Sequence, residues 1–100
     1  MAFLAVPAGL ATGTTDAARK ADGKMLLESR CGRCHSIEAA GKSPLRSAPP
    51  LRDVYRQYPI EQLAFELSEG MGSRHKEMPQ IQFSTEQVEQ ILDYLNSITD

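Results

Sequence analysis

Two cysteines and one histidine stand close together in this chain, in the order Cys31-Gly32-Arg33-Cys34-His35. They are the only two cysteines and one of the only two histidines in the sequence, so chance placement seldom produces such a cluster. On a helix, positions i, i+3 and i+4 point to one side. We therefore expect both thiols and the imidazole to face the same object, and the rest of the chain to fold around it.

The size and composition of the chain make a bound group plausible on physical grounds. Its 100 residues are enough for one domain, and only 6% of them are aromatic, with no tryptophan. A small core of this kind is often supplemented by a disulfide, a metal or a cofactor. The formal net charge of −2 argues against a nucleic-acid partner. The sequence has no apolar run of the length that a membrane span needs, roughly 18 residues.

The spacing Cys-x-x-Cys-His is the attachment signature of c-type haem. It predicts thioether bonds from Cys31 and Cys34 to one haem, with His35 as a ligand of the haem iron. Three alternatives compete with this interpretation. A structural zinc site would need His75 as well and would crowd two adjacent ligands. A thioredoxin-like dithiol lacks its βαβ context here, and a disulfide across so short a loop would be strained and gain little.

A second axial ligand is expected on the opposite side of the iron. Met78 is the best placed, because Pro79 biases it away from helical geometry and stiffens the chain there. His75 and Met71 are the rival ligands. Met25 is set aside, since a methionine on a helix face usually packs into the core.

Apolar spacing predicts an all-α domain with three or more helices and long loops. A first helix should begin near Asp16 to Asp22 and continue into the cysteine cluster, with Gly23 allowing another element to approach. Residues 40–50 predict a loop, and a further loop should follow over 70–83. A helix over Ile60–Glu69 should have Pro59 at its first position and end at Gly70. Its apolar face would comprise Ile60, Leu63, Ala64 and Leu67.

The last helix has the clearest signals. Ser84 should cap it, with Gln87 in the capping-box position. Its apolar stripe would be Val88, Ile91, Leu92, Leu95 and Ile98. At the other end of the chain, residues 1–17 suit either the remnant of a secretory signal or a disordered extension. The folded domain is therefore expected over residues 18–100.

With these motifs in place, most of residues 20–98 resembles a class I c-type cytochrome, a small soluble electron carrier. The matching features are Gly23 with Leu26-Leu27, the Cys31–His35 motif, the Ala48-Pro49-Pro50-Leu51 segment, and Gly70 and His75 leading to Met78-Pro79, followed by Tyr94-Leu95. The family usually has an aromatic residue where this chain has Leu27.

The resemblance implies a cytochrome c-like fold, with helices wrapped around one covalently bound haem c and its iron. The first and last helices would cross near Gly23 and Tyr94. The carbonyl of Pro49, or less favourably that of Pro50, would accept the Nδ1 proton of His35 and so tune the metal. Electron transfer with His35 and Met78 as axial ligands is the implied activity, and the protein would be a carrier rather than an enzyme.

Two other functions remain open. One is a haem sensor or peroxidase-like protein in which the distal ligand is displaceable. The other is a haem subunit of a larger oxidoreductase complex. As a free carrier we expect a monomer that docks transiently on redox partner proteins. Export to a periplasm is the expected location, with the mitochondrial intermembrane space as second choice.

Charge is segregated along the chain. Residues 19–56 hold nine basic and four acidic side chains, whereas residues 57–100 hold two basic and eight acidic ones. This is either an ordinary solvated surface or a dipole that orients the molecule on its partner. A basic rim could comprise Lys24, Arg33, Lys42 and Lys76. Arg52, Tyr55 and Tyr58 are expected in a loop that could reach the haem propionates, although a tyrosine there more often serves packing.

Overall fold

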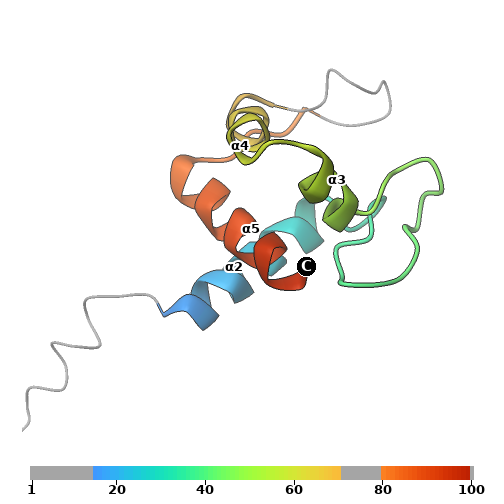
Figure 1. Ribbon diagram of the computed structural model, residues 1–100, viewed down its shortest axis with the longest axis horizontal. Coiled ribbons are helices and arrows are strands. Elements are labelled where there is room, and N and C mark those ends of the chain that lie inside the picture. Colours follow the sequence, from blue (N-terminus) through green and yellow to red (C-terminus); the bar gives the residue numbers. More distant parts are fainter. Residues whose placement is uncertain (1–14, 71–79, 100) are drawn as a thin grey trace, which may run out of the picture.

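The computed structural model describes residues 15–70 and 80–99, and over these residues the chain forms helices and no strand. In chain order the helices are α2 (Asp16–Arg30), α3 (Leu51–Gln57), α4 (Ile60–Glu69) and α5 (Thr85–Ile98) (Figure 1). The expected all-α class is confirmed. The expectations for most of the N-terminal segment, and for Met71, His75, Lys76 and Met78, fall outside the described residues.

Helix α2 begins and ends on local signals. The Thr15 side chain accepts a 3.0 Å hydrogen bond from the Ala18 amide and thereby caps the first turn. Asp16 in the first turn and Arg30 in the last complement the helix dipole. The expected start of this helix is confirmed, and Leu27 is almost fully buried, at 1% exposure.

Helix α5 has the predicted capping box. The Ser84 side chain accepts from the Gln87 amide, and the Gln87 side chain accepts from the Ser84 amide. Along the helix the apolar stripe turns inward, since Val88, Ile91 and Leu95 are buried. Leu92 and Ile98 at the edges of the stripe are half-buried and pack against the same core.

Helices α2 and α5 cross in direct contact, bringing residues near both ends of the domain together (Figure 1). At the crossing, a Cβ on Gly23 would overlap the Gln90 carbonyl and lie 2.6 Å from its carbon. Gly23 therefore permits the close approach predicted for it, although its nearest neighbour is Gln90, one turn before Tyr94. Beside the crossing, the Arg19 guanidinium lies 2.7 Å from the Asp93 carboxylate.

The middle of the chain contains a helix where the sequence predicts a loop. Arg52 and Tyr55 lie on helix α3 instead of in a loop, and Tyr58 is its C-cap. Pro50 precedes this helix as its N-cap. Proline is tolerated there because the helix needs no hydrogen bond from the backbone amide at that position. The short helix follows two prolines, which hid it within a segment that looked like a loop.

Helix α4 has the predicted bounds, but Pro59 is its N-cap instead of its first helical residue. Leu63 and Leu67 are buried, whereas Ile60 in the first turn is 48% exposed and does not belong to the buried face as expected. Gly70 ends the helix with a φ of 111°, a conformation that favours glycine. Beyond it, the Phe83 amide donates to the Leu67 carbonyl at 2.9 Å and ties the chain back to α4.

Met25 is 65% exposed on α2, so the expectation that it packs into the core is wrong. The face of α2 that carries Gly23 and Leu27 is the one turned to α5, and Met25 lies off that face. None of the helices within the described residues combines the length and the apolar character that a bilayer crossing requires.

Candidate functional site

The Cys31–His35 segment follows α2 as a turn. The sequence spacing predicts that the helix continues through these residues, and this prediction is wrong. Cys31 is the C-cap of α2, and its amide donates to the Leu27 carbonyl at 2.7 Å. The Cys31 carbonyl then accepts from the amides of Cys34 at 3.1 Å and of His35 at 2.9 Å. The last of these bonds has helical i+4 spacing, so a single helical turn still joins the three residues of the motif.

The imidazole of His35 is oriented by the backbone of a distant segment. Its Nδ1 lies 2.7 Å from the Pro49 carbonyl oxygen. A carbonyl only accepts, so this contact requires the proton on Nδ1 and leaves the lone pair on Nε2. Pro49, and not Pro50, is the partner, and the ring is in the tautomer that binds a metal through Nε2.

The segment between His35 and α3 is fastened at several points. The Leu45 amide donates to the Cys34 carbonyl at 3.0 Å, and the Leu51 amide donates to the Ser36 carbonyl at 2.9 Å. The Ser36 amide donates to the Ser43 hydroxyl at 2.9 Å. These bonds return the chain to the cysteine motif and bring Pro49 beside His35.

The two thiols are half-buried and are not joined to each other. Burial raises the pKa of the Cys31 thiol to about 11, although the nearby Arg30 charge opposes the shift. A dithiol oxidoreductase needs a thiolate with a lowered pKa. The environment of Cys31 therefore disfavours the thioredoxin-like alternative. The described residues contain no group of three Cys, His, Asp or Glu side chains that could hold a metal ion, and His75, which the zinc alternative requires, lies outside them.

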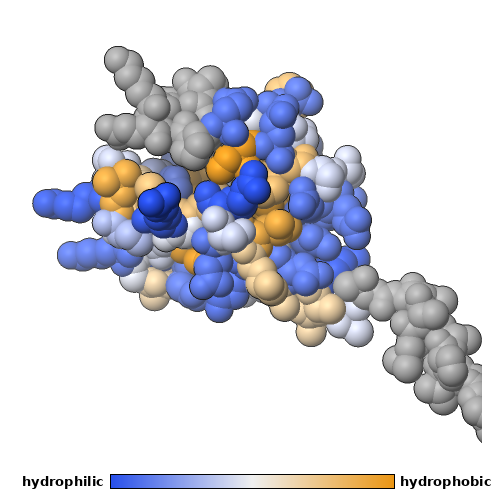
Figure 2. Space-filling model, turned by 180° about the vertical axis from the view of Figure 1, so that it is seen from behind, coloured by the Kyte–Doolittle hydropathy of each residue, from blue (hydrophilic) through white to orange (hydrophobic). Residues whose placement is uncertain are grey.

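Apolar side chains on several elements are left partly uncovered at the edge of the core. They are half-buried, and those that pack against the core include Leu51, Val54, Tyr58, Ala64 and Ile81. Figure 2 shows hydrophobic surface in the middle of one face, bordered by hydrophilic residues. An apolar disc such as a porphyrin would cover surface of this kind. Two adjacent thiols, an oriented imidazole and partly uncovered apolar side chains together fit a covalently held haem.

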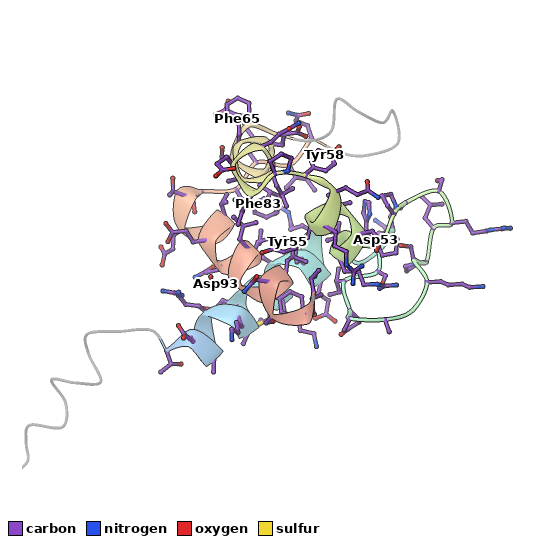
Figure 3. The ribbon with its side chains drawn as sticks, in the orientation of Figure 1. Asp53, Tyr55, Tyr58, Phe65, Phe83 and Asp93 are labelled. Atoms are coloured by element: carbon purple, nitrogen blue, oxygen red, sulfur yellow. The ribbon has the colours of Figure 1, made fainter. Side chains whose placement is uncertain are left out.

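Helix α5 is tied to the chain just beyond the motif, and to α3, by hydrogen bonds that the sequence did not reveal. The Tyr94 hydroxyl donates to the Ile37 carbonyl at 2.7 Å, and burial raises the pKa of Tyr94. Tyr55, labelled in Figure 3, extends from α3 and donates to the Asn96 side chain at 2.9 Å. The sequence placed Tyr94 near a helix crossing, but no local pattern indicates a partner so distant along the chain.

Arg52 is the second residue whose role sequence reasoning missed. Its guanidinium donates to the Ser36 hydroxyl and to the carbonyls of Glu38 and Gly41. It is therefore engaged within the loop that leads to Pro49.

The expected basic rim is only partly open to a partner. Arg33 and Lys42 are exposed, but the Lys24 ammonium lies 3.7 Å from the Glu38 carboxylate.

Phe65 on α4 points away from the rest of the molecule in Figure 3 and is 64% exposed.

Comparison with known proteins gives one family. The family model described as "Cytochrome c" matches residues 20–99 of the chain. The match covers all four described helices apart from the first turn of α2, together with the Cys31–His35 motif. No curated protein and no solved structure gives a significant match.

Proposed function

This chain belongs to the cytochrome c family, and on that premise we propose that it carries single electrons between protein partners through one covalently bound haem c. Haem binding and electron transfer are the general activity of the family. The observation that carries the proposal is the 2.7 Å contact between His35 Nδ1 and the Pro49 carbonyl, which presents an imidazole beside two thiols. When bound, haem supplies an iron centre that accepts and releases one electron.

Cys31 and Cys34 would hold the haem by thioether bonds. In each case the thiol would add across a haem vinyl group, with sulfur bonding to one carbon and the thiol hydrogen going to the other. No oxidant is consumed. The neighbouring turn fixes both residues relative to His35.

His35 and Met78 are the proposed axial ligands of the iron. His35 would bind through Nε2, since the proton on Nδ1 is engaged by Pro49. Met78 lies outside the described residues, so its role rests on the sequence, where Pro79 follows it. A thioether ligand raises the reduction potential relative to a second histidine, and full coordination leaves no position for a substrate. An electron carrier follows from this ligand set, and an enzyme does not.

The proposed partners are redox proteins that dock transiently at a small interface. Arg33 and Lys42, two exposed basic residues of the expected rim, would steer an acidic partner. We propose a monomer, exported to a periplasm, where haem attachment of this type takes place. The mitochondrial intermembrane space is the second proposed location.

The test combines a pyridine haemochrome assay on the wild type with ferric absorption spectra of the native wild type and of three variants, Met78→Ala, His75→Ala and Met71→Ala. We expect one haem per wild-type chain, retained after acid–acetone extraction, and thiols that no longer react with alkylating agents. Only Met78→Ala should convert the ferric absorption spectrum from low-spin to high-spin. An unchanged Met78→Ala spectrum, with a shift in one of the other two variants, would assign the distal role to His75 or Met71.

The alternative functions make different predictions for the same samples. A ferric wild type that is high-spin and binds cyanide at once would favour a sensor or a peroxidase-like protein. Co-elution of the native protein with an oxidoreductase on gel filtration would favour a subunit of a larger complex. A colourless wild-type extract with two reactive thiols would refute the proposal.

A further inference from the structure

We propose that Arg52 is a positioning residue for the histidine ligand. Its guanidinium holds the loop over residues 36–50 so that the Pro49 carbonyl stays on His35 Nδ1. The inference rests on the proposed function, because it concerns how the chain sets the properties of that iron ligand.

The Arg52 side chain reaches three separate points of the loop. Its Nη1 donates to the Ser36 hydroxyl at 3.3 Å and to the Glu38 carbonyl at 3.1 Å, and its Nη2 donates to the Gly41 carbonyl at 2.7 Å. A guanidinium presents its donors in a rigid planar fork, so three acceptors in one arrangement suit arginine far better than lysine.

The loop depends on such contacts because it contains no regular structure. Over residues 36–50 the backbone forms no helix or strand. Loops of this length without internal secondary structure are usually mobile unless side chains order them. The Gly41 carbonyl that Arg52 binds belongs to a residue with φ of 105°, and a Cβ there would meet nothing. A side chain at Gly41 would thus point into open space, and the 2.7 Å bond from Arg52 fixes its carbonyl.

Arg52 and Pro49 lie at the same end of α3, so contacts that fix the position of Arg52 also restrict the position of Pro49. Pro49 stands one residue before the N-cap Pro50, and Arg52 is the second residue of the helix. The Leu51 amide between them donates to the Ser36 carbonyl at 2.9 Å. The Ser36 side chain, which accepts from Arg52, belongs to the residue directly after His35. The guanidinium therefore closes a ring of contacts that contains both His35 and Pro49.

The consequence lies in the electronic character of His35. A strong hydrogen bond from Nδ1 makes the imidazole a more basic ligand. A more basic ligand favours ferric over ferrous iron and lowers the reduction potential. If the Arg52 contacts keep the bond between His35 Nδ1 and the Pro49 carbonyl short, weakening these contacts should raise the reduction potential. It should also speed the exchange of the Nδ1 proton with solvent.

The test compares Arg52→Lys with Arg56→Lys in the haem-loaded protein. Both changes conserve charge on α3, so neither alters the electrostatic contribution of the side chain. Arg56 is exposed and its Nη1 donates to Asp53 on its own helix, at 2.9 Å, which makes it a matched control. The measurements are the exchange rate of the His35 Nδ1 proton by NMR, the exchange of the backbone amides of Ser36, Leu45 and Leu51, and the reduction potential.

In Arg52→Lys we expect the His35 Nδ1 proton and these three amides to exchange about tenfold faster, which corresponds to about 1.4 kcal/mol, with a higher reduction potential. Arg56→Lys should leave all three measurements unchanged. Gly41→Ala, which disturbs the acceptor and leaves the charges intact, should change them in the same direction.

Unchanged Nδ1 exchange and potential in a haem-loaded Arg52→Lys protein would overturn the inference and leave the proposed function standing. Faster exchange of the three amides with an unchanged Nδ1 proton would show that Arg52 only stabilises the loop, and would overturn it too. A wild type without haem would refute the proposed function itself.

Discussion

The Tyr94 hydroxyl donates a 2.7 Å hydrogen bond to the backbone carbonyl of Ile37, a residue 57 positions earlier in the chain. Both partners are buried. The bond joins the last helix to the segment that leaves the Cys31–His35 turn, so the site is held from the end of the domain as well as from its beginning.

Removing this hydroxyl should destabilise the protein. Tyr94→Phe leaves the buried Ile37 carbonyl without its partner, and we expect the free energy of unfolding to fall by about 1–3 kcal/mol. Tyr55→Phe is the control, because that hydroxyl bonds to an exposed Asn96 side chain and should cost less. Urea unfolding of the haem-loaded proteins measures both. Equal losses in the two variants would contradict the assignment.

The contribution of Tyr94 should also depend on pH. Burial, and then the charges of Glu38 and Glu28, raise the pKa of Tyr94 above its ordinary value of 10.0. Above pH 10 the unfolded chain loses a proton that the folded protein retains, so stability falls as the pH rises. The difference in stability between wild type and Tyr94→Phe should thus be constant below pH 10 and shrink above it. A difference that stays constant or widens in alkaline urea titrations would contradict this prediction.

The helix crossing makes Gly23→Ala a severe substitution. In an open helix this change stabilises by about 1 kcal/mol. Here the added Cβ would overlap the Gln90 carbonyl, and helices α2 and α5 would have to separate. We expect a net loss of about 1–3 kcal/mol. Met25→Ala, two residues away and 65% exposed, should change stability by less than about 0.5 kcal/mol. Thermal unfolding followed by circular dichroism measures both.

The ion pair between Arg19 and Asp93 should contribute little, and less in salt. The Asp93 carboxylate, on the side of α5 that meets α2 in Figure 3, lies 2.7 Å from an Arg19 guanidinium nitrogen. Both side chains are more than a third exposed. A double-mutant cycle with Arg19→Ala and Asp93→Ala should give a coupling of about 0.2–1 kcal/mol that shrinks at about 1 M salt. A coupling that salt does not alter would indicate that hydrogen bonding, and not charge, dominates the pair.

Local signals in the sequence were sufficient to predict three of the four described helices, α2, α4 and α5. The capping box of Ser84 and Gln87 and the stop at Gly70 depend on neighbours within one turn, and both were predicted correctly. The close approach at Gly23 was also predicted, since glycine in a helix usually has a packing reason. Pro49 was expected through the resemblance to c-type cytochromes, and the structure confirms its contact with His35.

Features that depend on distant partners could not be predicted in this way. Helix α3 was hidden behind Pro49 and Pro50, so Arg52 was assigned to a loop and its reach to Gly41 was missed. Ile60 fits the apolar spacing of its helix, yet its side chain stays 48% exposed. The assignments of Cys31, Cys34, His35 and Met78 to haem remain predictions.

The contact between Gly23 and Gln90 has a consequence for how the domain is made. Helix α2 precedes α3, α4 and α5 in the chain, so the surfaces that meet at Gly23 can pack together only after the chain between them has been synthesised. Until then the segment with both cysteines lacks its packing partner, and pairing distant parts of a chain is slow. Both thiols should therefore be more accessible in a chain whose α5 has not yet docked than in the folded domain, where they are half-buried.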